Sequence, residues 1–203
     1  MKTIIITGPS ASGKTQLAHK LLELFNDSII LKTDSYYRDN FLIRFLSIFK
    51  VDIYDKTISL KKNEIKKTLN SLYNKEEFVL FSHYDFKRKQ SSQTKIKINY
   101  KGDKQFLILE GIFSHRLDIN YQETINIVCE SDKEICINRR LRRDQIERAR
   151  NCKEVNKKFN KSWFLFYKNL PKYINNNQVI VINPVDINSY KNLVFNLQNI
   201  KNN

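Results

Sequence analysis

The chain has 203 residues and a formal net charge of +15, with 41% hydrophobic and 28% charged residues. This balance excludes a wholly disordered chain, and the length predicts one domain over 1–203. No apolar stretch approaches the roughly 18 residues of a membrane-spanning helix, so no membrane association is expected. The three cysteines form no CxxC pair, which favours reduced thiols in a cytoplasmic protein.

The first predicted strand is the β-branched run Ile4–Ile6, and apolar residues from Leu17 to Phe25 recur at helical spacing. A loop that contains two glycines separates this strand from this helix. A second strand is predicted at Ser28–Leu31. The order of strand, loop, helix and strand forms a βαβ unit, which predicts a parallel sheet.

The remainder of the chain continues this alternation of strands and helices. Buried strands are predicted at Phe78–Phe81, Phe106–Leu109, Ile125–Cys129 and Val179–Ile182, and helices at Leu60–Tyr73, Asp132–Arg150 and Lys157–Asn169. The segment Lys95–Tyr100 instead alternates strictly between polar and apolar residues. It is predicted to pair as a half-exposed antiparallel strand with Phe78–Phe81.

Glycine is scarce, with four residues where average usage gives about 14. Two of the four lie in a run that matches the Walker A pattern, between a predicted strand and a predicted helix. Its residues are expected to bind phosphate: Gly8, Ser10, Ala11, Ser12, Gly13, Lys14 and Thr15. Lys14 is expected to reach the β- and γ-phosphates, and the Thr15 hydroxyl to ligate Mg²⁺. The alternative is a tight turn with an exposed lysine.

Two carboxylates follow predicted strands. Glu110 ends an apolar strand, where it is expected to hold Mg²⁺ directly or through water; the alternative is a solvated carboxylate. Asp34 follows the second strand, where ligands bind in doubly wound sheets, and can accept the proton of an attacking hydroxyl. Tyr36 and Tyr37 add stacking surface beside it. The alternative for Asp34 is a helix N-cap.

An arginine-rich segment covers residues 139–150 and begins after a capping-box helix start. Arginines that close over a phosphoryl group stabilise the charge of its transition state, and Arg143, Arg148 and Arg150 are predicted to do so. A mobile helix that carries them would also exclude water. The alternative is a solvated helix with i,i+4 pairs between arginines and acidic residues.

These motifs resemble, in order, those of the uridine kinase (uridine–cytidine kinase) family of P-loop kinases, from about Ile4 to Val181. The matching segments are Gly8–Thr15, Asp34–Arg38, Tyr84–Phe86, Glu110–Ile112, Arg139–Arg150 and Leu170–Tyr173. The resemblance implies an α/β fold of the P-loop NTPase type. Its doubly wound parallel sheet would carry a small antiparallel hairpin layer on the substrate side, as an insertion at about 78–104. A helical arginine lid is expected at about 139–158.

The resemblance implies transfer of a phosphoryl group from ATP, with Mg²⁺, to the 5′-hydroxyl of uridine or cytidine. The implied catalytic residues are Asp34 as general base, Lys14, Arg143 and Arg148. Arg150 would join the arginines that meet the ATP phosphates. The residues implied to contact the acceptor are Asp34, Tyr36, Tyr37, Tyr84, Asp85 and Arg139.

The acceptor remains open at this point. Lys89 stands where a base-recognising histidine is expected after Phe86. Nicotinamide riboside, pantothenate or a sugar phosphate would use the same catalytic half. A basic nucleic-acid-binding P-loop protein is a rival that the charge supports, although the basic residues are spread along the chain and nucleic acid is not the expected partner. A P-loop module without catalysis, a homo-oligomer and GTP as donor also remain open.

Overall fold

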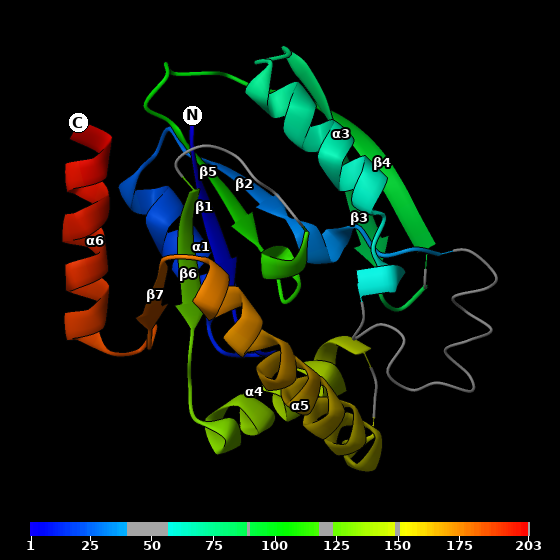
Figure 1. Ribbon diagram of the computed structural model, residues 1–203. Coiled ribbons are helices and arrows are strands. Elements are labelled where there is room, and N and C mark those ends of the chain that lie inside the picture. Colours follow the sequence, from blue (N-terminus) through cyan, green and yellow to red (C-terminus); the bar gives the residue numbers. More distant parts are fainter. Residues whose placement is uncertain (40–56, 89, 118–123, 149–150, 203) are drawn as a thin grey trace.

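The computed structural model describes residues 1–39, 57–88, 90–117, 124–148 and 151–202, without the side chains of 147 and 148. In this part of the chain, five strands form a parallel sheet in the order β2-β5-β1-β6-β7 (Figure 1). The strands are β1 (Lys2–Thr7), β2 (Ile29–Lys32), β5 (Phe106–Glu110), β6 (Thr124–Cys129) and β7 (Val179–Ile182). The predicted α/β fold with a parallel sheet is confirmed.

Helices pack on both faces of the sheet. They are α1 (Lys14–Leu24), α3 (Lys62–Tyr73), α4 (Lys133–Arg148), α5 (Cys152–Asn176) and α6 (Ile187–Asn202). Successive side chains of a strand point to opposite faces, so Ile4 and Ile6 pack with α1 and α6, whereas Ile5 packs with α3 and α5. Each strand of the sheet centre therefore contributes to two apolar cores, which explains its nearly continuous apolar sequence.

The antiparallel pair consists of β3 (Phe78–Asp85) and β4 (Gln90–Lys97), which lie beside α3 (Figure 1). The pairing runs from Phe78 opposite Lys97 to Asp85 opposite Gln90. The predicted position of the second strand, 95–100, was wrong by several residues. Asp85 accepts hydrogen bonds from the backbone N–H groups of Lys87 and Arg88, and this turn sets the register.

One helix extends beyond its prediction, and another was not predicted. Helix α5 runs from 152 to 176 and includes Pro171, where the prediction ended at 169. Phe166 and Leu170 of its buried face pack on the sheet core. The C-terminal helix α6 was not predicted, although Leu193 and Leu197 form its buried stripe. Asp186 precedes α6 and accepts hydrogen bonds from the backbone N–H groups of residues 188 and 189.

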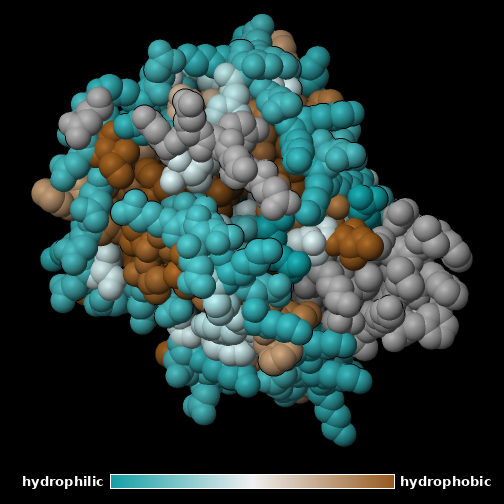
Figure 2. Space-filling view, in the orientation of Figure 1, coloured by the Kyte–Doolittle hydropathy of each residue, from teal (hydrophilic) through white to brown (hydrophobic). Residues whose placement is uncertain are grey.

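The surface is mostly hydrophilic on the face seen in Figure 2, with apolar side chains on the side where α6 and β7 lie. Val181 of β7 and Phe195 of α6 are among the exposed apolar residues. A search of the described helices finds none that is long and apolar enough to cross a membrane. The three cysteines, all within the described ranges, are free thiols.

Candidate active site

The loop between β1 and α1 has the geometry of a phosphate-binding turn. Gly13 has φ +97°, a left-handed conformation that L side chains rarely adopt. A side chain at Gly8 would stand 2.6 Å from the Cys129 carbonyl oxygen, so the loop can pass close to the end of β6 only with glycine. These contacts explain why half of the glycines in the chain lie in this loop.

The first helical turn after the loop carries the two predicted phosphate and metal ligands. Lys14 is buried, and its Nζ donates a 3.1 Å hydrogen bond to the carbonyl oxygen of Pro9, so the ammonium group lies across the loop. The Thr15 hydroxyl donates to Glu110 Oε1 at 3.1 Å. The N-terminus of α1 adds free N–H groups and a positive dipole end, so this region favours anions.

Parallel pairing brings the two carboxylates of the site to one edge of the sheet. Glu110 ends β5, opposite Lys32 of β2 and Ile6 of β1. Asp34 follows β2 in a short 3-10 helix, η1 (Thr33–Ser35), and both its carboxylate oxygens accept from the Ile112 N–H at 3.2 Å. A Cβ atom at Gly111 would lie 2.8 Å from Asp34 Oδ1 and would collide with Thr33 Oγ1.

The environment of Asp34 makes its carboxyl an effective base near neutral pH. Burial, together with the nearby Glu110 carboxylate, raises the pKa of Asp34 from 3.8 to about 6. Lys14, the Ile112 N–H and Arg143 act in the opposite direction. Because the charges of Lys14, Glu110 and Arg143 each shift the pKa of Asp34, all three groups lie close enough to act on it electrostatically. The structure therefore brings together these four predicted residues.

Helix α4 directs one arginine toward this site and buries another. Arg143 binds Asp144 Oδ1 through Nε at 3.0 Å and Nη2 at 2.8 Å, while its side chain stays about one-third exposed. Arg140 is buried; its Nη1 donates to Ser162 Oγ of α5 at 2.9 Å and its Nε lies 3.8 Å from Asp144. Arg140 therefore ties α4 to α5, whereas other basic residues of the segment, such as Arg139, are exposed.

The other predicted arginines are placed less fully. Arg139 is exposed on α4. Arg148 is the last residue of α4, but its side chain lies outside the described part of the chain. Arg150 and Lys89 lie outside the described residues altogether.

Three of the predicted acceptor residues, Tyr36, Tyr37 and Tyr84, are buried in the core, and Asp85 lies at a turn. The rings of Tyr37, Tyr84 and Phe86 contact one another with centroid separations of 4.9–5.6 Å, and Phe86 is the partly exposed ring of this cluster. The Tyr36 hydroxyl donates a 3.0 Å hydrogen bond to Thr68 Oγ1. Asp85 caps the hairpin turn, and the N–H groups of Arg88 and Lys87 hold the pKa of its carboxyl below the usual value.

Several polar residues that support this site were not predicted from the sequence. Asp144 was considered only as part of a motif and as an i,i+4 partner of Arg148 on a solvated helix, yet it is fully buried between Arg140 and Arg143. Thr7 and His115 were not singled out, although they meet directly behind the phosphate loop. An unusual threonine at the end of an apolar strand is the one signal for Thr7 in the sequence.

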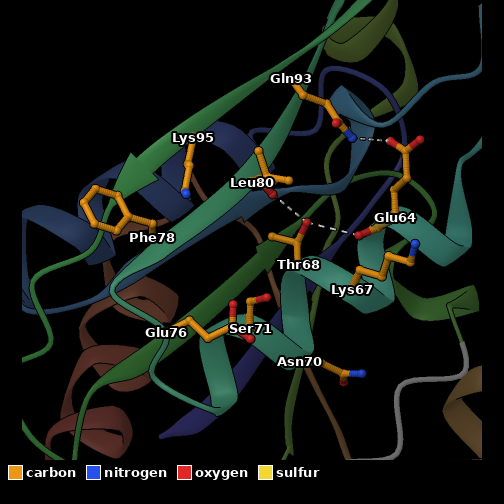
Figure 3. Close-up of a pocket in the computed structure, with 10 residues that line it drawn as sticks. All are labelled: Glu64, Lys67, Thr68, Asn70, Ser71, Glu76, Phe78, Leu80, Gln93 and Lys95. Atoms are coloured by element: carbon orange, nitrogen blue, oxygen red, sulfur yellow. Dashed lines mark hydrogen bonds between the residues drawn. The ribbon is translucent and has the colours of Figure 1, made fainter.

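A groove of about 530 Å³ lies between α3 and the β3–β4 hairpin (Figure 3). Phe78, Leu80 and Lys95 line its hairpin side, and Glu64 and Lys67 line its helix side. Of the described residues that form its lining, none belongs to the predicted phosphate or acceptor site. The groove therefore takes no part in the site described above.

Comparison with known proteins agrees with this geometry. The model of the phosphoribulokinase / uridine kinase family matches residues 3–183. Curated relatives include uridine kinases of Lactobacillus helveticus, 31% identical over 74% of this chain and 71% of that protein, and of Lactococcus lactis subsp. cremoris, 33% identical over 76% and 75%. Among solved structures, deoxyadenosine kinase of M. mycoides with bound dATP aligns with a TM-score of 0.51 at 12% identity, over 97% of this chain and 99% of that one, which supports the fold.

The match extends over nearly the whole chain, and it includes the phosphate loop, the Asp34 segment and the Glu110 strand end. Members of this family transfer a phosphoryl group from ATP to an alcohol, as the arrangement of loop lysine, carboxylates and arginine also indicates. The chain therefore belongs to the phosphoribulokinase / uridine kinase family and is an ATP-dependent phosphotransferase.

Proposed function

We propose that the protein transfers the γ-phosphoryl group of ATP to the 5′-hydroxyl of uridine or cytidine. The observation that carries this proposal is the position of Asp34, a carboxylate within electrostatic reach of Lys14 and Arg143 at the edge where β1, β2 and β5 end. The relatives that are named uridine kinases support the pyrimidine nucleoside as acceptor.

In the proposed reaction, Lys14 and the loop amides hold the triphosphate against the N-terminus of α1. Asp34 accepts the proton of the 5′-hydroxyl. As this proton leaves, the 5′-oxygen of the nucleoside forms the new bond to the γ-phosphorus, and the bond between the γ-phosphorus and the ADP oxygen breaks. Arg143 is proposed to stabilise the charge on the transferring group, while its two hydrogen bonds to Asp144 hold its guanidinium. Arg148 and Arg150 are proposed to complete the arginine lid.

The residues at the strand end suit Mg²⁺. The Thr15 hydroxyl and the Glu110 carboxylate are hard oxygen ligands, already 3.1 Å apart, on a sheet edge next to the phosphate loop. Mg²⁺ is commonly held by one or two protein oxygens together with substrate phosphates and water. We propose that these two residues hold it, and that the bound ion neutralises phosphate charge.

The acceptor is proposed to lie beside the ring cluster of Tyr37, Tyr84 and Phe86, where the partly exposed Phe86 offers surface for a planar base and the buried Tyr37 and Tyr84 support its ring. Asp85 and Arg139 are proposed as its polar contacts. Tyr36 serves this region from the core, where it supports η1 through its bond to Thr68.

An acceptor panel tests the proposal. Uridine, cytidine, adenosine, nicotinamide riboside, pantothenate and a sugar phosphate are each incubated with ATP and Mg²⁺, and both ADP and phosphorylated product are measured. We expect 5′-monophosphates from uridine and cytidine, and none from 5′-deoxyuridine, the matched acceptor without the attacking hydroxyl. Product from another acceptor only would replace the substrate assignment. Steeply salt-dependent oligonucleotide binding with no product from any acceptor would favour the nucleic-acid-binding rival.

A further inference from the structure

A chain of hydrogen bonds links the residue directly before the phosphate loop to the backbone that holds Asp34. Thr7 is the last residue of β1, directly before Gly8, and it is fully buried. Its hydroxyl donates to the Ile112 carbonyl oxygen at 3.3 Å and lies 2.8 Å from His115 Nδ1. The N–H group of Ile112 in turn donates to Asp34. Ile112 is thus held through both of its backbone polar groups.

The surroundings of His115 determine which ring nitrogen carries its proton. The ring packs edge-on against Phe166 and Tyr173 of α5, with centroids 5.4 and 5.2 Å away. Burial, with the charge of Arg116 as a smaller effect, lowers the pKa of His115 to about 4, so the ring is neutral at pH 7. Its Nε2 is buried without a hydrogen-bond partner among the described residues.

A buried N–H without an acceptor is rarer and more costly than a buried lone pair. The proton of the neutral ring therefore belongs on Nδ1, where the Thr7 oxygen accepts it. The Thr7 hydroxyl proton is then directed to the Ile112 carbonyl oxygen. Each group in this chain donates once, and the chain has a single direction, from His115 through Thr7 to Ile112.

We propose that His115 is a positioning residue for phosphoryl transfer: through Thr7 it fixes the Ile112 backbone, and the Ile112 N–H orients the Asp34 carboxylate toward the acceptor hydroxyl. The proposal rests on the proposed function, because it assigns Asp34 the role of base. His115 also connects this backbone to α5 through its ring contact with Phe166. One turn earlier on α5, Ser162 accepts a hydrogen bond from Arg140 of α4.

Two variants remove the chain of hydrogen bonds with little change of shape. His115→Phe keeps an aromatic ring between Phe166 and Tyr173, and Thr7→Val keeps a β-branched residue in β1. We expect each to lower kcat about 3- to 10-fold, the weight of one hydrogen bond, with the KM for ATP unchanged and with no further loss in the double variant. Tyr173→Phe is the matched control, because it removes the partly buried 2.7 Å hydrogen bond to Asn126 and should lower Tm without lowering kcat.

The Asp34→Asn background distinguishes this inference from the proposed function. If the wild type phosphorylates neither uridine nor cytidine, the proposed function fails; if Asp34→Asn retains full turnover, Asp34 is not the base and the role of His115 is refuted with it. If Asp34→Asn loses turnover but His115→Phe has wild-type kcat, or lowers kcat equally in both backgrounds, only the role of His115 is refuted. We expect His115→Phe to have no effect in the Asp34→Asn background. Nitrogen NMR of the wild-type protein adds a test without substitution: a proton on Nε2 instead of Nδ1 would overturn the inference.

Discussion

Replacing Asp34 by asparagine should separate activity from stability. The variant lacks the proton acceptor, so we expect turnover to fall on the order of 10²–10⁴-fold while ATP still binds. Its stability should change in the opposite direction. The pKa of Asp34 rises from 3.8 to about 6 on folding, chiefly through burial, which means that folding opposes the ionised form. At about 1.4 kcal/mol per pH unit, the ionised carboxylate costs the native state about 3 kcal/mol.

The sign of this effect follows from proton binding. Between pH 3.8 and about 6 the folded state holds a proton that the unfolded state has lost, so wild-type stability falls as the pH rises through this range and stays lower above it. Asparagine carries no such penalty. We therefore expect Asp34→Asn to be more stable than the wild type at pH 8, by up to about 3 kcal/mol, with no such gain below pH 3.8.

Denaturant unfolding at pH 8 and at pH 3.5, together with steady-state kinetics, measures both effects. Asp186→Asn is a matched control with the opposite sign, because hydrogen bonds from Ser189 lower the pKa of Asp186 and its carboxylate stabilises the folded state at neutral pH. The reasoning is refuted if Asp34→Asn keeps wild-type turnover, or if it is less stable than the wild type at pH 8.

Three further substitutions test other parts of the site. Gly111→Ala would place a methyl group 2.8 Å from Asp34 Oδ1, so kcat should fall on the order of 10²-fold in steady-state assays; wild-type kcat would show that Asp34 need not stay in place. Glu110→Gln should raise the Mg²⁺ concentration for half-maximal activity on the order of 10-fold, and an unchanged Mg²⁺ titration would exclude Glu110 from the metal site. Arg143→Gln should lower kcat on the order of 10²-fold and, since Arg143 lowers the pKa of Asp34, move the acid limb of the pH–rate profile upward; an unshifted limb would contradict their proximity.

The sheet and the position of the proposed chemistry could be predicted from the sequence because both depend on local patterns. The apolar runs at Ile4–Ile6 and Phe106–Leu109 lie within β1 and β5, and parallel pairing places the residues after them at one edge. Asp34 and Glu110 follow such strands, so the sheet topology alone brings them near the phosphate loop. The loop itself needs glycines, and the scarcity of glycine made it conspicuous.

The remaining features depend on contacts between distant residues. The register of β4 follows from the turn that Asp85 caps, and the alternating residues at 95–100 carry little information because most side chains of β4 are exposed. Tyr36 became a core residue because Thr68 of α3 accepts a hydrogen bond from its hydroxyl group. Arg140 became one because Ser162 of α5 accepts a hydrogen bond from its guanidinium and the buried Asp144 carboxylate balances its charge. No local pattern distinguishes Arg140 from the exposed Arg139.

A crystal structure with uridine, Mg²⁺ and a non-hydrolysable ATP analogue would test the shared reaction centre most directly. The account predicts the γ-phosphate on Lys14 and the nucleoside 5′-oxygen within hydrogen-bonding distance of the Asp34 carboxylate, about 3 Å, and facing the γ-phosphorus. A 5′-oxygen held by another group, with Asp34 turned away from both bound molecules, would contradict it.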